Sequence, residues 1–265
     1  MIRIGAVIVF ITVIAAIVAP WVVPYDPASQ ELWLRLDRPS VAHPFGLDEL
    51  GRDIFSRVLA GARISLLVGL TVVSISSFVG ILLGSVAGYF GGWIDDVISR
   101  AIDVLLAFPG ILLAIALVAV LGPNLTNVVM ALSFIGWVGY ARVVRGQVLK
   151  ARELEFVQAA RALGAGTPRI LLRHVIPTAM PAVMVQATLG MAGAILAEAS
   201  LSFLGLGVQP PTPSWGTMLN GGRLHLLDAP HLTIFPGAAI AVLVLGFNFL
   251  GDGLRDELDP KRYRT

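Results

Sequence analysis

The sequence predicts an all-α, polytopic membrane protein with six transmembrane helices in one domain that spans residues 1–265. Of the 265 residues, 56% are hydrophobic and only 14% are charged, and the mean hydropathy is +0.83, which is too apolar for a soluble domain. A helix rises about 1.5 Å per residue and the hydrocarbon core is about 30 Å thick, so a span needs about 20 uncharged residues. Six stretches meet this requirement: Ile4 to Val23, Ile64 to Tyr89, Val104 to Gly122, Asn124 to Tyr140, Thr178 to Ala197 and Leu232 to Gly251.

Residues 1–23 are predicted to form the first transmembrane helix, although a cleaved signal peptide is the alternative. Arg3 precedes the apolar run, as in a signal peptide, but the run exceeds the roughly 7 to 15 residues of a signal h-region. The run ends in Ala19-Pro20-Trp21 and lacks an Ala-x-Ala cleavage site. We therefore expect this helix to be retained.

The distribution of basic residues predicts that both termini are cytoplasmic. Cytoplasmic loops are enriched in Arg and Lys, whereas acidic residues contribute little to orientation. With the N-terminus inside, thirteen basic residues fall on the cytoplasmic side: Arg3, Arg100, Arg142, Arg145, Lys150, Arg152, Arg161, Arg169, Arg173, Arg255, Lys261, Arg262 and Arg264. Six fall outside: Arg35, Arg38, Arg52, Arg57, Arg63 and Arg223.

Two long outer loops have different features. Residues 24–62 form a predicted periplasmic loop between the first helix and a five-helix core, 63–265. Within this loop, residues 48–59 are predicted to form a short helix on the membrane surface. Residues 206–231 contain Pro210-Pro211-Thr212-Pro213, which excludes a regular helix at those prolines.

The inner loop from Ala141 to Pro177 predicts a short cytoplasmic helix at about residues 153–164. Glu153 and Glu155 suit a first helical turn, and Gly164 suits a C-terminal stop. Thr167 and Pro168 are typical of the cap and first residue of a second helix. The alternative is an ordinary basic loop that only fixes topology.

Several residues within the spans have two interpretations each. Gly80, Gly84 and Gly88 form a small-residue stripe that packs either inside the chain or against a partner permease. Glu198 either caps a short returning helix, residues 200–206, or belongs to an outer gate together with Phe203.

The third span contains two further local features. Asp103 follows Arg100 by three residues, so we expect an ion pair on one helical face. Pro109 is expected to kink the helix.

The residue inventory excludes several function classes. Without cysteine there is no disulfide framework or thiolate metal site, and the four histidines lack close metal-ligand spacing. A P-loop needs Gly-Lys-Ser/Thr, yet Lys150 follows Leu149 and Lys261 follows Pro260, so this chain has no ATP site. No hydrolase motif is present, so we expect no enzymatic activity. A secondary transporter is a further alternative, for which Glu198 is the candidate ionisable group.

The inner loop resembles the EAA loop of permease subunits of binding-protein-dependent ABC importers. The resemblance rests on Gln158-Ala159-Ala160-x3-Gly164, with Pro177 thirteen residues further on, between the fourth and fifth of six helices. It implies a type I (MetI-like) permease architecture in which this loop is the coupling helix that docks onto an ATPase. The implied contact residues are Glu155, Phe156, Gln158, Ala159, Ala160, Ala162, Leu163 and Gly164.

Other segments resemble the C-type permease of dipeptide, oligopeptide and nickel importers. They are the runs His43 to Arg57, Gly61 to Ser65, Ala199 to Gly207 and Pro213 to Gly216. The resemblance implies a chain that forms half of a peptide pathway in the inner membrane, with nickel, glutathione and haem as alternative cargoes. It also implies three kinds of partner: a B-type permease, two ATPase subunits or one fused ATPase, and an extracytoplasmic binding protein. No cofactor is expected on this chain, and ATP and magnesium are expected on the ATPases. Nucleic acid is not an expected partner.

Overall fold

A computed structural model describes residues 1–258 and consists of helices joined by loops. The part of the basic tail that contains Lys261, Arg262 and Arg264 lies outside the described residues. The helices are α1 (Ile2–Val22), α2 (Ile54–Phe90), α3 (Gly92–Leu106), α4 (Gly110–Leu121), α5 (Leu125–Ala151), α6 (Glu155–Ala162), α7 (Thr167–Ile170), α8 (Ile176–Phe203), α9 (Trp215–Gly222) and α10 (His231–Leu258).

Five helical stretches are each long and apolar enough to cross a membrane: α1, α2, α5, α10 and the continuous run Thr167–Phe203 that contains α7 and α8. Helices α3 and α4 supply a sixth span if they are counted together, and they are bent by 85° relative to each other. Pro109 lies at the break and is the N-cap residue of α4. The predicted kink is therefore a full break in the helix.

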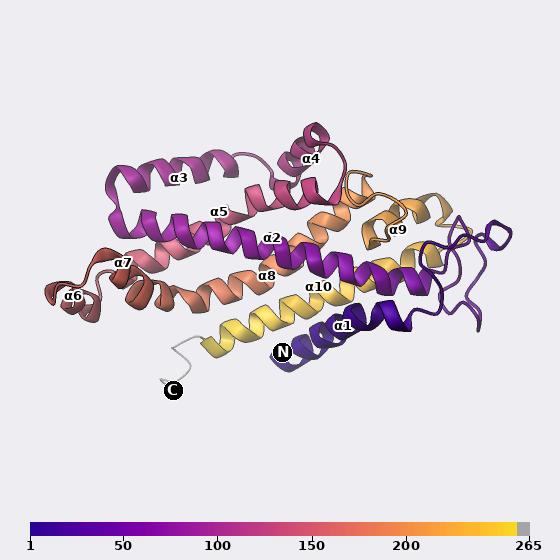
Figure 1. The fold of residues 1–265 in the computed structure, drawn as a ribbon, viewed down its shortest axis with the longest axis horizontal. Coiled ribbons are helices and arrows are strands. Elements are labelled where there is room, and N and C mark those ends of the chain that lie inside the picture. The colour runs from indigo at the N-terminus through magenta and orange to yellow at the C-terminus, as the bar shows by residue number, and fades with distance from the viewer. Residues whose placement is uncertain (259–265) are drawn as a thin grey trace.

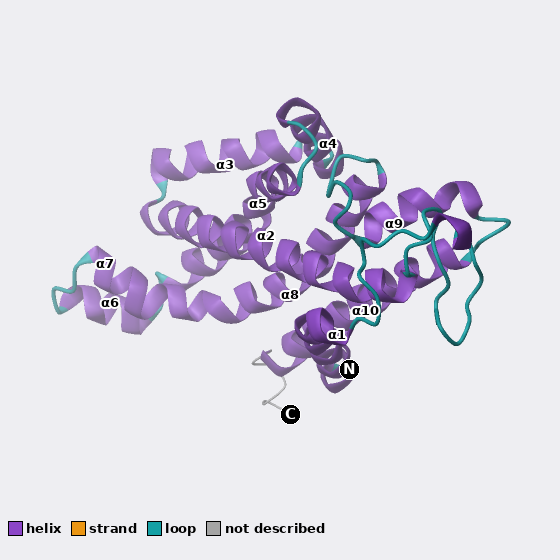
Figure 2. Cartoon of the chain, turned by 45° about the vertical axis from the view of Figure 1, so that its right-hand side comes forward, coloured by secondary structure: helices purple, strands orange, loops and turns teal. Residues whose placement is uncertain are grey.

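The long helices lie side by side, and the shortest helices, α6, α7 and α9, lie toward the two ends (Figure 1). Helices α6 and α7 lie at one end, which we call the α6 end. The loop of residues 23–53 and helix α9 lie at the other, which we call the α9 end (Figure 2). Helix α1 runs toward the α9 end, whereas α2 and α10 run from the α9 end toward the α6 end, so both are antiparallel to α1 (Figure 1).

Helices α2 and α5 make the most extensive helix–helix contact in the described fold, and glycine permits it. A Cβ on Gly80 would lie 2.4 Å from Tyr140 Cβ, and a Cβ on Gly84 would lie 2.5 Å from the Ala141 carbonyl oxygen. On Gly88 it would lie 2.9 Å from the Arg145 carbonyl oxygen. The glycine stripe therefore packs inside this chain, because its small residues let two helix backbones approach.

Helix α2 begins earlier than predicted and includes part of the expected surface helix. Asp53 caps α2, since its side chain accepts a hydrogen bond from the Ser56 amide at 2.7 Å. Residues 54–59 are the first turns of α2, and residues 48–53 belong to the preceding loop. The prediction of a separate surface helix was wrong, because α2 begins directly after its cap at Asp53 and residues 54–59 are part of the spanning helix.

The segment after α8 also differs from the prediction. Helix α8 ends at Phe203, and Gly205, two residues later, has a φ of +80° that does not continue a helix. Residues 200–206 therefore do not form a separate returning helix. Helix α9 follows instead, beyond the prolines. Ser214 and Thr217 form a capping box at its start, which is a local signal for a helix.

The expected ion pair between Arg100 and Asp103 is absent from the described residues. Asp103 instead lies 3.7 Å from Arg142 of α5, and both side chains are largely exposed. The prediction considered only neighbours on one helix, and packing of α3 beside α5 supplies a competing arginine.

Candidate functional site

Helix α6 presents most of its surface to solvent at the α6 end. Val157 is its one buried residue and anchors it. Phe156 is 47% exposed and Leu163, directly after the helix, is 89% exposed. Exposed apolar residues grouped on a short helix are typical of a surface that binds another protein. The structure brings the predicted contact residues together here: Glu155, Phe156, Gln158, Ala159, Ala160, Ala162, Leu163 and Gly164.

Gly164 ends α6 in the way that its sequence position predicts. Its φ is +82°, a left-handed conformation that favours glycine. The Ala165 amide donates to the Ala160 carbonyl and the Gly164 amide donates to the Arg161 carbonyl, both at 3.0 Å, which is the Schellman pattern. Thr167 and Pro168 are the first two residues of α7, while Gly166 is its N-cap residue, so the predicted cap was one residue late.

Two arginines contact the end of α2: Arg152, which directly follows α5, and Arg161 of α6. Arg152 donates to the carbonyl of Gly88 at 3.0 Å, where α2 ends and its carbonyls lack helical partners. Arg161 of α6 places its guanidinium 5.7 Å from the centre of the Tyr89 ring, within range of a cation–π contact. Tyr89 therefore joins the exposed helix to the closely packed pair α2 and α5.

After α6, the chain continues through α7 and a π-helical segment into α8. Residues Leu171–Val175 form a π-helical segment that joins α7 to α8. Pro177 follows, and because proline lacks an amide hydrogen it removes one helical hydrogen bond. The wider π turn accommodates this gap without ending the helix.

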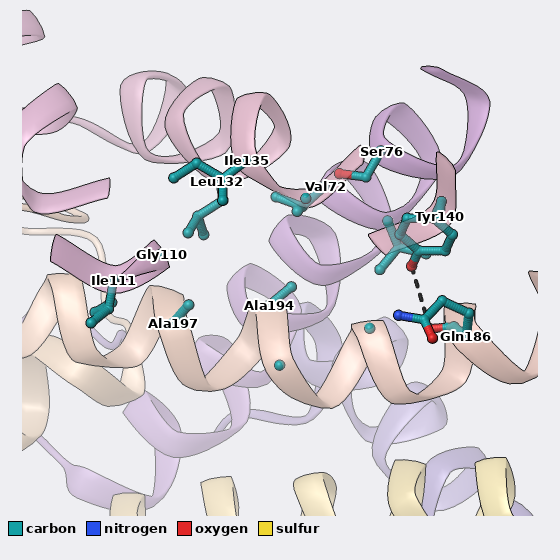
Figure 3. Close-up of a pocket in the computed structure, with 14 residues that line it drawn as sticks. Val72, Ser76, Gly110, Ile111, Leu132, Ile135, Tyr140, Gln186, Ala194 and Ala197 are labelled. Atoms are coloured by element: carbon teal, nitrogen blue, oxygen red, sulfur yellow. Dashed lines mark hydrogen bonds between the residues drawn. The ribbon is translucent and has the colours of Figure 1, made fainter. Parts of the chain in front are cut away.

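A cavity of about 260 Å³ lies between α2, α4, α5 and α8. Its lining is mostly glycine, alanine and aliphatic residues, and it contains no charged side chain. The polar groups are Ser76, Tyr140 and Gln186. Figure 3 shows the Tyr140 hydroxyl directed at Gln186, and it donates to the Gln186 backbone carbonyl at 3.5 Å. Gly110 and Ile111 line the cavity beside the break between α3 and α4.

Glycines bring the polar groups to the cavity. A Cβ on Gly190 would lie 2.3 Å from the Tyr140 hydroxyl, and a Cβ on Gly136 would lie 2.4 Å from the Ser76 hydroxyl. Ser76 is 1% exposed, and its hydroxyl has no hydrogen-bond partner among residues 1–258. The cavity can therefore supply a few hydrogen bonds to an uncharged polar group, but no ion pair.

Glu198 lies in a separate buried cluster toward the α9 end. It is 0% exposed and accepts a hydrogen bond from Ser202 at 2.7 Å. The Ser202 hydroxyl also accepts from the Val208 amide at 3.2 Å, and Ser65 of α2 and Ser214, the N-cap of α9, face the same carboxyl. This cluster joins α2, α8 and the start of α9.

Phe203, the other residue predicted for an outer gate, is half-buried near that cluster. Its ring centre lies 6.0 Å from the Arg223 guanidinium. Neither Phe203 nor Glu198 lines the cavity between α2, α4, α5 and α8.

A family model identifies the chain. The model described as binding-protein-dependent transport system inner membrane component matches residues 80–264. The chain belongs to this family. It is therefore an inner-membrane permease of an ABC importer, a class that works with ATPase and substrate-binding-protein partners.

Similar permeases extend the match to nearly the whole chain. The glutathione transport system permease protein GsiD of Escherichia coli O157:H7 is 50% identical over 258 residues, which cover 97% of this chain and 85% of that protein. The dipeptide transport system permease protein DppC of Alkalihalophilus pseudofirmus is 47% identical over the same shares. The predicted resemblance to this permease family is confirmed.

Solved structures show the same fold at low sequence identity. An amino acid ABC transporter with histidines matches with a TM-score of 0.59 and 17% identity, over 77% of this chain and 95% of that one. The MetNI methionine ABC transporter in an inward-facing conformation matches with a TM-score of 0.58 and 18% identity, over 77% of this chain and 97% of that one. The predicted all-α, type I importer architecture is confirmed.

Some features of this permease were not predicted from its sequence. Tyr140, Gln186 and Ser76 come from three helices, so only the fold brings them to one cavity. Asp95 and Arg145 form a two-bond ion pair, with one oxygen–nitrogen distance of 2.6 Å, between residues fifty positions apart. Because the residues of the cavity and of this ion pair lie on different helices, spacing along one helix could predict neither.

Proposed function

We propose that this permease is the C-type subunit of an importer of small peptides. It forms half of the pathway, and a B-type permease forms the other half. Glutathione, a tripeptide, and dipeptides both fall within this cargo class. ATP and magnesium bind to partner ATPases, either two subunits or one fused chain, and ATP is hydrolysed there.

The uncharged cavity is the observation that carries the cargo proposal. Peptides differ in side-chain charge but share amide groups, so a pathway without charged residues and with a few hydrogen-bonding groups passes many sequences with little discrimination. Hydroxyl and amide groups in the lining replace some of the water that a peptide bond loses on entry. The names of the similar glutathione and dipeptide permeases support the same class.

Helix α6 is the proposed docking element for an ATPase. Its exposed apolar residues suit docking, and its contact with Tyr89 and its connection through α7 to α8 suit an element that transmits ATPase movement to the spanning helices. This role places the α6 end in the cytoplasm and the α9 end outside. Both termini are then cytoplasmic, as the distribution of basic residues also favours.

Uptake by the complete importer tests the cargo proposal. The assembled complex with its binding protein is reconstituted in proteoliposomes, and ATP-dependent uptake of a labelled dipeptide, glutathione and nickel is compared. We expect saturable uptake of at least one of the two peptides and none of free nickel. Uptake of nickel without either peptide would overturn the cargo proposal while leaving the permease assignment intact.

The absence of cysteine allows a direct test of orientation. Leu163, at the α6 end, and Leu227, which is 97% exposed at the α9 end, are each replaced by cysteine. A membrane-impermeant maleimide added to intact spheroplasts should label L227C but not L163C, and lysis should make L163C reactive. The reverse pattern would refute the proposed orientation.

A further inference from the structure

A second, larger groove opens between α1 and α2. Its volume is about 750 Å³, within the range of small-molecule sites. Its walls run from Val9 to Trp21 on α1 and from Arg63 to Leu70 on α2, and Met191 and Phe247 lie between them. Met191 and Phe247 are 9% and 6% exposed, so they form a packed floor.

Close packing of α1 elsewhere explains why the groove begins at Val9. At its N-terminal end, α1 lies against α10 through glycine: a Cβ on Gly5 would lie 2.5 Å from the Leu250 amide nitrogen, and a Cβ on Gly253 would lie 2.4 Å from Ile2 Cβ. Beyond this contact, the groove opens between α1 and α2. The groove therefore lies along the second half of α1.

The groove is apolar along its length and charged at one end. Among the described residues that line it, Arg63 is the one that carries a charge. Its side chain is exposed and makes no hydrogen bond or ion pair with any residue from 1 to 258. Trp21 lies at the same end and is 79% exposed, as is typical of aromatic residues at a membrane interface. An unpaired arginine in a membrane segment is costly unless it reaches an anion or water.

The length of the groove matches one leaflet of a bilayer. Twelve residues separate Val9 from Trp21, which corresponds to about 18 Å along a helix. Half of the hydrocarbon core is about 15 Å. An acyl chain that starts at Arg63 and Trp21 would therefore end near Val9 and Leu70.

We propose that this groove binds a phospholipid of the leaflet at the α9 end. One acyl chain lies along the groove between α1 and α2, and the headgroup phosphate accepts hydrogen bonds from the Arg63 guanidinium. Arginine presents planar paired donors that match a phosphate. The lining contains no acidic residue to balance an ammonium group, so the site prefers phosphatidylglycerol over phosphatidylethanolamine.

Lipid binding to the unmodified importer tests the proposal without any variant. The assembled complex, purified through a tag on this chain, is stripped of lipid and titrated with phosphatidylglycerol or phosphatidylethanolamine. Native mass spectrometry then counts bound lipid. We expect one phosphatidylglycerol per copy of this chain to remain bound at collision energies that remove phosphatidylethanolamine. Equal retention of the two lipids would overturn the preference and the role of Arg63.

Matched variants then assign the lipid to this groove. Arg63→Gln removes the proposed phosphate contact, and Arg38→Gln removes an exposed arginine of the loop at the same end. Leu67→Trp fills the groove, and Leu82→Trp adds the same bulk on α2 outside it. Leu67 and Leu82 are each 55% exposed, so the two changes are comparable.

The expected outcome separates the two pairs of variants. Arg63→Gln should weaken phosphatidylglycerol binding about tenfold, the loss expected for a charge-assisted hydrogen bond, and Leu67→Trp should abolish the tightly bound lipid. Arg38→Gln and Leu82→Trp should bind as the unmodified chain does. Unchanged binding in both groove variants would refute the proposal. So would a cross-link between residue 67 and a partner subunit, because that subunit would then fill the groove.

Discussion

Replacing Gly84 by alanine should destabilise the permease, because the new methyl group meets backbone. The added Cβ would lie 2.5 Å from the Ala141 carbonyl oxygen and 3.0 Å from both Ala141 Cα and Val144 Cβ. Restoring a contact of about 3.4 Å requires α2 and α5 to separate by about 0.9 Å along that line, and overpacking of this kind costs about 1 to 3 kcal/mol. A backbone oxygen cannot rotate away, so the upper half of that range applies.

Better helix propensity offsets part of this cost. Alanine is favoured over glycine in a helix interior by about 1 kcal/mol, which leaves a net loss of about 1 to 2 kcal/mol. For a chain of this size, each kcal/mol corresponds to roughly 2 to 4 °C in Tm. We therefore expect Gly84→Ala to lower Tm by roughly 2 to 8 °C, measured as loss of the monodisperse peak in size-exclusion chromatography after heating.

Gly146→Ala is the matched control on the facing helix. A Cβ at Gly146 meets nothing within 4 Å, so only the gain in helix propensity remains and Tm should stay the same or rise. Equal Tm values for the Gly84 and Gly146 variants would refute the claim that close backbone contact, rather than composition, fixes the α2 and α5 pair.

Three further predictions concern the two ends of the molecule. Leu163→Glu should prevent co-purification of the ATPase without lowering the Tm of the permease, since this side chain is 89% exposed; retained co-purification would contradict docking at α6. Arg161→Ala should lower ATP-driven uptake severalfold while leaving ATPase co-purification intact, because the contact with Tyr89 is lost. Tyr89→Phe keeps the aromatic ring and removes only the 3.4 Å hydrogen bond from Arg161 to the Tyr89 hydroxyl, so it should retain most uptake, and equal losses in these two variants would assign the coupling to that hydrogen bond and argue against the cation–π contact. Glu198→Gln should preserve Tm because an amide oxygen can still accept from Ser202, whereas Glu198→Leu should cost about 1 to 3 kcal/mol by leaving buried hydroxyls unpaired; a stable leucine variant would show that the cluster does not hold α9.

Local chemistry was readable from the sequence where one segment determines the outcome. Pro109 separates two helices because proline lacks an amide hydrogen and restricts the residue before it, and Gly164 ends one because other residues avoid its backbone conformation. The apolar spans follow from bilayer thickness alone. Each of these features depends on residues within a few positions of one another.

Features that depend on which helices are neighbours were not readable. Asp103 pairs with Arg142 rather than with Arg100, because α3 lies beside α5. The cavity around Tyr140 and Gln186 also requires the close approach that Gly190 allows. The start of α2 was misplaced for a related reason: the cap at Asp53 joins a polar turn to an apolar span that was considered separately.

Because the helical run from Thr167 to Phe203 is continuous, α7 and α8 can act together as one lever. Its 37 residues correspond to a rod of about 55 Å, so a tilt of about 10° around its midpoint moves each end by about 5 Å in opposite directions. One end adjoins α6 and the other carries the Glu198 cluster that holds α9. A small rotation imposed at α6 would thus bring helices closer together at one face of the membrane and separate them at the other. The cavity lies near the middle of this run, so it would move little.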